Sequence, residues 1–262
     1  MRLMMYLFAV ALLMLGSAMM THAQVQDEGL ILYFSFDEAS GNTVTDETGG
    51  GNDGLITGAD IATDEVVHGD GSLLCDENGD SVTVESFSAL ENYQDNSYLF
   101  WLNFTVPGSG GWDQIIAKKA PGSDRSPGIW TCNRTTLHIH YRFNPGNAGS
   151  LCVGPEGEGD EFATGDWHHI AGIKEGTNFK FYIDGEVVDE QTVPASHVQG
   201  IEKLYIGQTN YNSAKFYLDE LFVYDRALSS DEVSDIMSGV LTPVEPKDKL
   251  STTWGQLKTR RD

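Results

Sequence analysis

Short runs of alternating apolar and polar residues, separated by Gly, Asn and Asp, extend along most of the chain. The alternation has a period of two, which is typical of β-strands that bury one face. About a dozen strands at this spacing predict an antiparallel β-sandwich or a β-barrel. The clearest runs are 30–36, 81–87, 97–106, 112–119, 137–143, 168–174, 179–184, 203–208 and 215–225.

One stretch near the C-terminus has a helical signature instead. Ser229 is followed three residues later by Glu232, which is the spacing of a capping box. Gly239 follows the apolar positions of this stretch and can end a helix, because glycine readily adopts the left-handed conformation found there. The sequence therefore predicts one short helix at the end of an otherwise all-β domain.

The two ends of the chain differ from the region between them. Arg2, an apolar run over 3–15 and small residues before and at Ala23 form the pattern of a secretory signal peptide, 1–23. The run is short for a bilayer span, but an uncleaved membrane anchor is the alternative. At the other end, 241–262 carries prolines and basic residues and is interpreted as a flexible tail. We predict an exported protein with one domain over 28–240.

The net charge argues against some classes of partner, and the cysteine content indicates a disulfide. The formal net charge is −23, and an acidic surface repels nucleic acid and anionic lipid. Three cysteines in an oxidising compartment suggest one disulfide and one remaining thiol. Cys132 and Cys152 flank a strand and its turn, so we predict that they pair, whereas Cys75 lies in an apolar run and is predicted to be a buried thiol.

The adjacent histidines His168 and His169 raise the question of a metal site. Because the run around them alternates with a period of two, they point to opposite faces of a strand and do not bind one metal together. The strand is followed by a second alternating run that ends at Asp184-Gly185, a strong signal for a two-residue hairpin turn. The pattern predicts a β-hairpin and not a catalytic cluster.

This hairpin, 166–188, resembles the central hairpin of the laminin G-like, concanavalin A-like jelly-roll family, with its Trp-His-His and Tyr-Ile-Asp-Gly motifs. Three further stretches resemble the family in the same order along the chain: 32–58, 68–85 and 204–233. The resemblance implies an all-β antiparallel jelly-roll β-sandwich, and it implies core positions for Trp101, Trp167 and His169. It does not specify a function, since this fold hosts lectins, adhesion modules and accessory domains of enzymes.

The resemblance also implies a structural calcium ion that joins the first and last strands. Its ligands would be Asp37, the carbonyl of Thr43 and Asp219, with Asp46 nearby. Calcium takes several oxygen ligands from carboxylates and carbonyls in irregular loops. The alternative is that these are ordinary turn and strand-end residues that face water.

A sugar-binding site needs exposed aromatic faces with polar groups beside them. Trp112, Trp130 and Tyr141 lie beside loops or on a strand that can line the concave face, and Arg142 and Asn144 can supply hydrogen bonds. The alternative is that these aromatic residues fill the core or cover its rim.

No catalytic motif accompanies these residues. The Glu-x-Asp-x-Glu motif of the glucanase relatives is absent, as is a Gly-x-Ser-x-Gly nucleophile elbow. We therefore predict a secreted, non-catalytic recognition module that binds a glycan. A structural or adhesive protein that binds an extracellular protein is the first alternative, and a glycoside hydrolase is the second.

Overall fold

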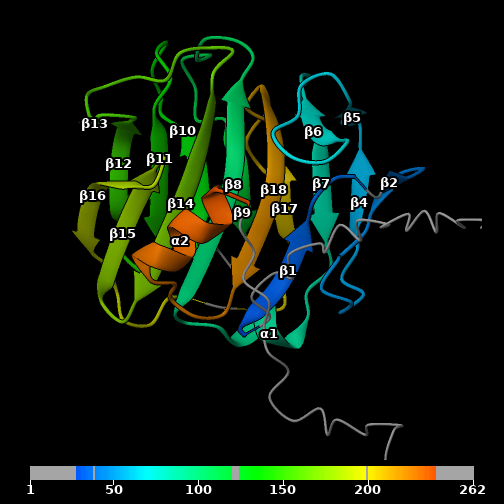
Figure 1. Cartoon of the computed structure of the whole chain (residues 1–262). Helices are drawn as coiled ribbons and strands as arrows, with labels where there is room; N and C mark the ends of the chain where they lie inside the picture. The colour runs from blue at the N-terminus through cyan, green and yellow to red at the C-terminus, as the bar shows by residue number, and fades with distance from the viewer. Residues whose placement is uncertain (1–27, 38, 120–123, 199, 240–262) are drawn as a thin grey trace, which may run out of the picture.

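The computed structural model describes residues 28–37, 39–119, 124–198 and 200–239. Within these residues the chain forms two antiparallel sheets that pack face to face (Figure 1). The first sheet is 8-stranded, with the order β16-β15-β14-β8-β18-β6-β5 and with β1 paired to β18. The second is 10-stranded, with the order β13-β12-β11-β10-β9-β17-β7-β4-β3-β2. The predicted signal peptide and tail lie outside the described residues.

The strands of the first sheet are β1 (Leu30–Phe34), β5 (Asp60–Ala62), β6 (Ser72–Cys75), β8 (Asn96–Phe104), β14 (Trp167–Glu175), β15 (Asn178–Ile183), β16 (Glu186–Thr192) and β18 (Phe216–Tyr224). The strands of the second sheet are β2 (Ala39–Ser40), β3 (Thr43–Val44), β4 (Gly54–Thr57), β7 (Ser81–Val84), β9 (Gln114–Lys118), β10 (Gly128–Thr131), β11 (Ile139–Phe143), β12 (Ala148–Gly154), β13 (Gly157–Glu158) and β17 (Leu204–Gly207). The two helices in the described part of the chain are α1 (Ser88–Asn92) and α2 (Ser230–Met237).

The main core lies between the two sheets, because every second side chain of a strand points to the same face. From β8 of the first sheet, Phe100 and Leu102 enter this core, and from the second sheet Ile129 and Ile139 enter it. All four side chains are buried. The predicted all-β antiparallel β-sandwich is confirmed.

A second apolar cluster covers the outer face of the first sheet. Helix α2 lies across this face (Figure 1), and its residues Val233 and Ile236 pack with Leu99 and Phe222 of the strands below. The predicted capping box begins this helix. The helix therefore closes a face that would otherwise expose apolar strand residues.

The predicted turns and helix end are also present. Asp184 and Gly185 have φ values of 52° and 83°, as a type I′ turn requires. Gly239 has a φ of 68°, and its backbone N–H donates to the carbonyl oxygen of Ile236 at 3.0 Å. Local sequence is sufficient to specify these features, because each depends on a few neighbouring residues.

All nine alternating runs overlap a strand of the structure. Most of these strands are shorter than the run or of the same length, and β14 extends one residue beyond its run at each end. The helix α1 was not expected. It is a single turn of five residues with no side-chain cap, so it lacks the periodicity and the capping residue that reveal a helix in a sequence.

The predicted disulfide between Cys132 and Cys152 is confirmed, with a Cα–Cα distance of 5.6 Å. The strands β10 and β12 are not direct neighbours, because β11 lies between them in the sheet. Cys132 follows the end of β10, and Cys152 sits at an irregularity in the pairing of β11 with β12. Cys75 is a buried free thiol, as predicted, and burial raises its pKa to about 12.

Two tryptophans expected in the core lie elsewhere. Trp101 and Trp167 are half-buried on the outer face of the first sheet, where Trp101 contacts the ring of His169 at 5.3 Å. The reason is the alternation itself, since Phe100 and Ile170 occupy the neighbouring inward positions. His169 is buried as expected, and its backbone N–H donates to Asp184 at 2.9 Å.

Candidate functional site

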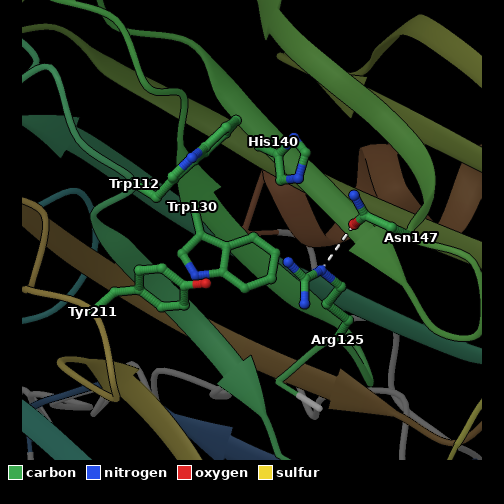
Figure 2. Close-up of a pocket in the computed structure, with 6 residues that line it drawn as sticks. All are labelled: Trp112, Arg125, Trp130, His140, Asn147 and Tyr211. Carbon is green, nitrogen blue, oxygen red and sulfur yellow. Dashed lines mark hydrogen bonds between the residues drawn. The ribbon is translucent and has the colours of Figure 1, made fainter.

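A pocket of about 150 Å³ lies on the outer face of the second sheet. Its floor comes from Trp130 on β10 and His140 on β11, which are directly opposite each other in the register of the two strands. Since their neighbours Ile129 and Ile139 face the core, Trp130 and His140 face away from it. Six side chains line the pocket (Figure 2): Trp112, Arg125, Trp130, His140, Asn147 and Tyr211.

The walls come from segments that are far apart in the sequence. Trp112 precedes β9, Arg125 precedes β10, Asn147 lies between β11 and β12, and Tyr211 lies between β17 and β18. The packing of the second sheet brings these connections to one place. The pocket is therefore a product of the tertiary fold and not of a local motif.

The aromatic rings of the pocket contact one another. The ring of His140 lies 4.7 Å from that of Trp112 and 5.5 Å from that of Trp130, between centroids. Tyr211 meets the indole of Trp130 edge-on at 5.9 Å. Trp112 is 36% exposed whereas Trp130 is 2% exposed, so one indole is accessible at the rim and the other forms the floor.

A glycine allows the floor indole to lie in this position. A Cβ atom at Gly128 would stand 2.3 Å from Cη2 of Trp130 and at the same distance from the carbonyl oxygen of Asp124. Any larger residue at Gly128 would therefore push against backbone as well as against the indole. The position of the indole thus explains why a glycine stands two residues before Trp130.

Two polar atoms at the floor have no hydrogen-bond partner within the described structure. They are Nε1 of Trp130 and Nδ1 of His140, and both are buried. A buried donor or acceptor without a partner costs about 1–3 kcal/mol, so such atoms usually bind water or a ligand group. A water molecule or a polar ligand group would complete the hydrogen bonding of these two atoms.

Arg125 forms one side of the pocket. Its guanidinium carbon lies 5.0 Å from the ring centre of Trp130, within the range of a cation–π contact. Its Nε donates to Oδ1 of Asn147 at 2.8 Å (Figure 2), and its Nη1 forms an ion pair with Asp124 at 3.1 Å. These contacts hold the side chain against the indole.

His140 is expected to remain neutral at physiological pH. Burial lowers its pKa to about 3, and the positive charges of Arg142 and Arg125 add to that effect. The unfolded chain takes up the same proton near pH 6.5, so this residue reduces stability as the pH falls from about 6.5 to about 3. An NMR titration should detect no protonation of His140 between about pH 8 and pH 5; a midpoint near 6.5 would contradict the buried position.

The structure brings together only part of the predicted ligand site. Trp112 and Trp130 line the pocket, but Tyr141 does not. Tyr141 is fully buried between the sheets, with its ring 4.8 Å from that of Phe179, so the expectation that it contacts a ligand is wrong. It follows His140 directly in β11 and therefore points to the opposite face.

The two polar residues predicted beside the aromatic ones lie next to the pocket and do not line it. Arg142 binds the turn that carries Asn147, through a bond from Nη1 to the carbonyl oxygen of Gly149 at 2.5 Å. The backbone N–H of Asn144 donates to the carbonyl oxygen of Arg125 at 2.9 Å. Both residues thus position the rim of the pocket.

Four lining residues were missed in the sequence: Arg125, His140, Asn147 and Tyr211. For His140 a signal was present, because the apolar residues at 139, 141 and 143 alternate with polar residues at 138, 140 and 142. That alternation places His140 on the outer face with Trp130 opposite it. The other three lie in loops, where no periodicity indicates direction.

Comparison with known proteins supplies the family. A family model described as "Concanavalin A-like lectin/glucanases superfamily" matches residues 76–234, which is more than half of the chain. The chain belongs to this family. The search for curated proteins with a similar sequence found no match.

Several solved structures share the concanavalin A-like fold of this chain. The binding domain of Paraclostridial Mosquitocidal Protein 1 matches with a TM-score of 0.62 and 14% identity, over 80% of this chain and 52% of that one. Domain 4 of AbnA, an extracellular arabinanase from Geobacillus stearothermophilus solved with arabinotriose, matches with a TM-score of 0.56 and 20% identity, over 79% and 98% of the two chains. Trypanosoma rangeli sialidase matches with a TM-score of 0.55 and 14% identity, over 79% and 32%.

The chain thus spans about half the length of the mosquitocidal binding domain, 52%, and about a third of the sialidase, 32%. At these identities the likeness shows the fold alone. Neither α1 nor α2, the helices in the described part of the chain, is long and apolar enough to cross a membrane.

Of the four calcium ligands implied by the family resemblance, Asp37 and Asp219 lie at one loop, and Thr43 and Asp46 have other surroundings. Oδ1 of Asp37 accepts from the backbone N–H groups of Asp70 and Gly71, at 2.5 and 2.8 Å. Oδ2 of Asp219 accepts from those of Val67 and His68, at 2.8 and 3.2 Å. These two carboxylates therefore hold the same loop, 67–71. Among the residues that the structure describes, no three His, Cys, Asp or Glu side chains converge as metal ligands.

Asp46 has a different role. Its carboxylate closes its own loop by accepting from the backbone and side chain of both Thr48 and Asn52, at distances of 2.8 to 3.2 Å. Thr43 lies in β3, opposite Leu55 of β4. Asp46 is therefore occupied by its own turn, but it is buried and does not face water as the alternative interpretation states.

One observation fits a cation at Asp219. Its Oδ1 is buried with no hydrogen-bond partner within the described structure, and burial raises the pKa of this carboxyl to about 6. The negative charge of Asp37 contributes to that rise. A calcium ion bound by Asp37 and Asp219 would supply the missing interaction and fasten loop 67–71 to the last strand.

If calcium binds there, a chelator should lower the melting temperature of the wild-type protein. At about 100 times its dissociation constant, the ion would contribute about 2.7 kcal/mol. Asp219→Asn should remove the sensitivity to the chelator, whereas Asp46→Asn should retain it. Identical melting curves of the wild type with calcium and with chelator would show that no ion stabilises this loop.

Proposed function

We propose that this protein is an exported, non-catalytic module that binds a carbohydrate through the pocket on the outer face of its second sheet. The observation that carries the proposal is the combination of an exposed indole with a buried polar floor. Trp112 offers an apolar face, while Nε1 of Trp130 and Nδ1 of His140 lack partners within the described structure. A sugar ring has the complementary surfaces, an apolar ring face and a rim of hydroxyl groups.

The size of the pocket supports this proposal. Its volume of about 150 Å³ is below the range of about 300–1,000 Å³ for drug-sized ligands, so it suits a single sugar unit of a glycan. The family and the fold provide context, since one structural neighbour was solved with arabinotriose and another is the binding domain of a mosquitocidal protein. These ligands and roles belong to the neighbours.

A binding role is favoured over catalysis by the composition of the pocket. Most glycosidases need two carboxyl groups on either side of the sugar, and none of the six lining residues is acidic. Export is supported by the predicted signal peptide and by the disulfide, since disulfides persist in oxidising compartments. The first alternative is an adhesive module that binds an extracellular protein.

The test begins with a glycan array probed with the mature protein, followed by calorimetry with a sugar that binds. Trp112→Ala should weaken binding by about 1–3 kcal/mol, because it removes the exposed stacking face. The melting temperature should fall less than for a fully buried tryptophan, since Trp112 is 36% exposed. Trp167→Ala is a matched control, because Trp167 is a half-buried tryptophan on the first sheet.

Equal affinities of the wild type and Trp112→Ala would place any sugar site elsewhere on the molecule. Loss of affinity in Trp167→Ala without a loss of stability would move the site to the first sheet. If no glycan binds and an extracellular protein does, the adhesive alternative replaces the proposal.

A further inference from the structure

We propose that the pocket selects sugars that carry an anionic group, a carboxylate or a sulfate. This inference rests on the proposed function and names the class of sugar that the site prefers. It follows from the distribution of charge along the chain and around the pocket.

The pocket is built from a segment whose charge is opposite to that of the chain. The net charge of the protein is −23, yet residues 118–155 contain one acidic residue and five basic ones, a net charge of +4. This segment contains all of β10, β11 and β12 and supplies four of the six lining residues. The basic residues of the segment are Lys118, Lys119, Arg125, Arg134 and Arg142.

Two of these charges lie at the pocket. Arg125 lines it directly, and Arg142 binds Asn147, which is another lining residue. The Nε atoms of both arginines donate to Oδ1 of Asn147, at 2.8 Å from Arg125 and 3.4 Å from Arg142. One exposed amide oxygen thus holds two guanidinium groups next to each other.

The positive charge at this point is only partly compensated. Arg125 forms an ion pair with Asp124, but in the described part of the chain Arg142 donates only to Asn147 and to the carbonyl oxygen of Gly149 and pairs with no carboxylate. The charges of both arginines reach the floor, where they help to lower the pKa of His140. The positive charges of the two arginines would therefore attract a negative group in the pocket. A neutral sugar gains no such attraction.

The aromatic walls restrict the kind of anion. Trp112, Trp130 and Tyr211 surround the space with ring surfaces, and the floor presents an indole N–H and a neutral imidazole. A bare inorganic anion would leave the ring surfaces unused. A sugar ring with one anionic substituent uses the indole face, the floor atoms and the guanidinium groups together.

The direct test compares ligands that differ only in charge. Glucose, glucuronate and glucose 6-sulfate, with the corresponding galactose and mannose series, would be titrated into the wild-type protein by calorimetry. In at least one series an anionic member should bind about tenfold more tightly than the neutral sugar. Raising sodium chloride from about 0.05 to about 0.5 M should reduce that preference, because salt screens charge attraction. The uronate and sulfate arms distinguish the two anionic groups.

Two charge-removing variants locate the effect. Arg125→Gln should abolish the preference for the anionic sugar, and Arg125→Lys should retain part of it. Arg134→Gln is the matched control, because Arg134 belongs to the same basic segment but is exposed and does not line the pocket. The ligand series itself requires no variant, so the inference is testable even if Arg125→Gln lowers stability.

Neutral sugars that bind as tightly as their anionic counterparts, with no effect of salt, would overturn the inference and leave the proposed function intact. Equal loss of the anionic preference in Arg125→Gln and Arg134→Gln would overturn it too, since the attraction would not belong to the pocket. Failure of every sugar on the array and in the panel, neutral or anionic, would contradict the proposed function itself.

Discussion

Replacing Tyr141 with alanine is expected to lower the free energy of unfolding by about 3–5 kcal/mol, the usual cost of removing a large buried aromatic ring. The ring of Tyr141 fills the space between the two sheets, 4.8 Å from Phe179 and 5.7 Å from Phe181. It also lies against Gly172 of the first sheet, where a Cβ atom would stand 2.4 Å from the ring. The ring of Tyr141 therefore occupies the space that a side chain at Gly172 would need.

Urea unfolding would measure this effect, and Tyr141→Phe provides the control. The hydroxyl of Tyr141 is buried with no hydrogen-bond partner within the described structure, so its removal should leave stability unchanged or raise it. A stable Tyr141→Ala protein that has lost sugar binding would contradict the assignment of this ring to the core. It would also revive the interpretation of Tyr141 as a ligand contact.

Removing the disulfide by the double change Cys132→Ser and Cys152→Ser is expected to cost about 3 kcal/mol. The bond closes a loop with a sequence separation of 20, and in the chain-entropy model the lost restraint on the unfolded state accounts for that cost. The residues between the two cysteines include Tyr141 and the floor residue His140, so the loop also carries part of the pocket.

Chemical unfolding with and without a reducing agent would test this prediction. The reducing agent should lower the stability of the wild type to that of the double variant and leave the double variant unchanged. Peptide mapping without reduction should recover Cys132 and Cys152 as one linked species. A link from Cys75 to either residue would show that the pairing is wrong.

Features that depend on neighbouring residues could be predicted from the sequence. The alternation of β14 and β15, the turn at Asp184-Gly185 and the capping box at Ser229 each follow from a few adjacent side chains. The disulfide was also predictable, since only three cysteines are present. The match to the concanavalin A-like family agrees with the motifs seen along the chain.

The pocket was harder to predict from the sequence, for two physical reasons. Arg125, Asn147 and Tyr211 lie in separate loops, and only the packing of the second sheet brings them together. From the sequence, Tyr141 is the predicted ligand contact, whereas His140 lines the pocket. The cause is simple, because a shift of one position along a strand moves the side chain to the opposite face. An aromatic side chain suggests a sugar contact at Tyr141, but the alternation in β11 places His140 at the pocket.

The indole signals of the protein offer the most direct measurement of the central claim, that the pocket binds a sugar. The chain has five tryptophans, so a ¹⁵N-labelled sample should give one Nε1–H signal for each in an NMR spectrum. Titration with a sugar that binds by calorimetry should shift the signals of Trp112 and Trp130, because these two indoles line the pocket, and leave those of Trp101 and Trp167 in place. Binding that shifts the signals of Trp101 or Trp167 and leaves Trp112 and Trp130 unchanged would contradict the account.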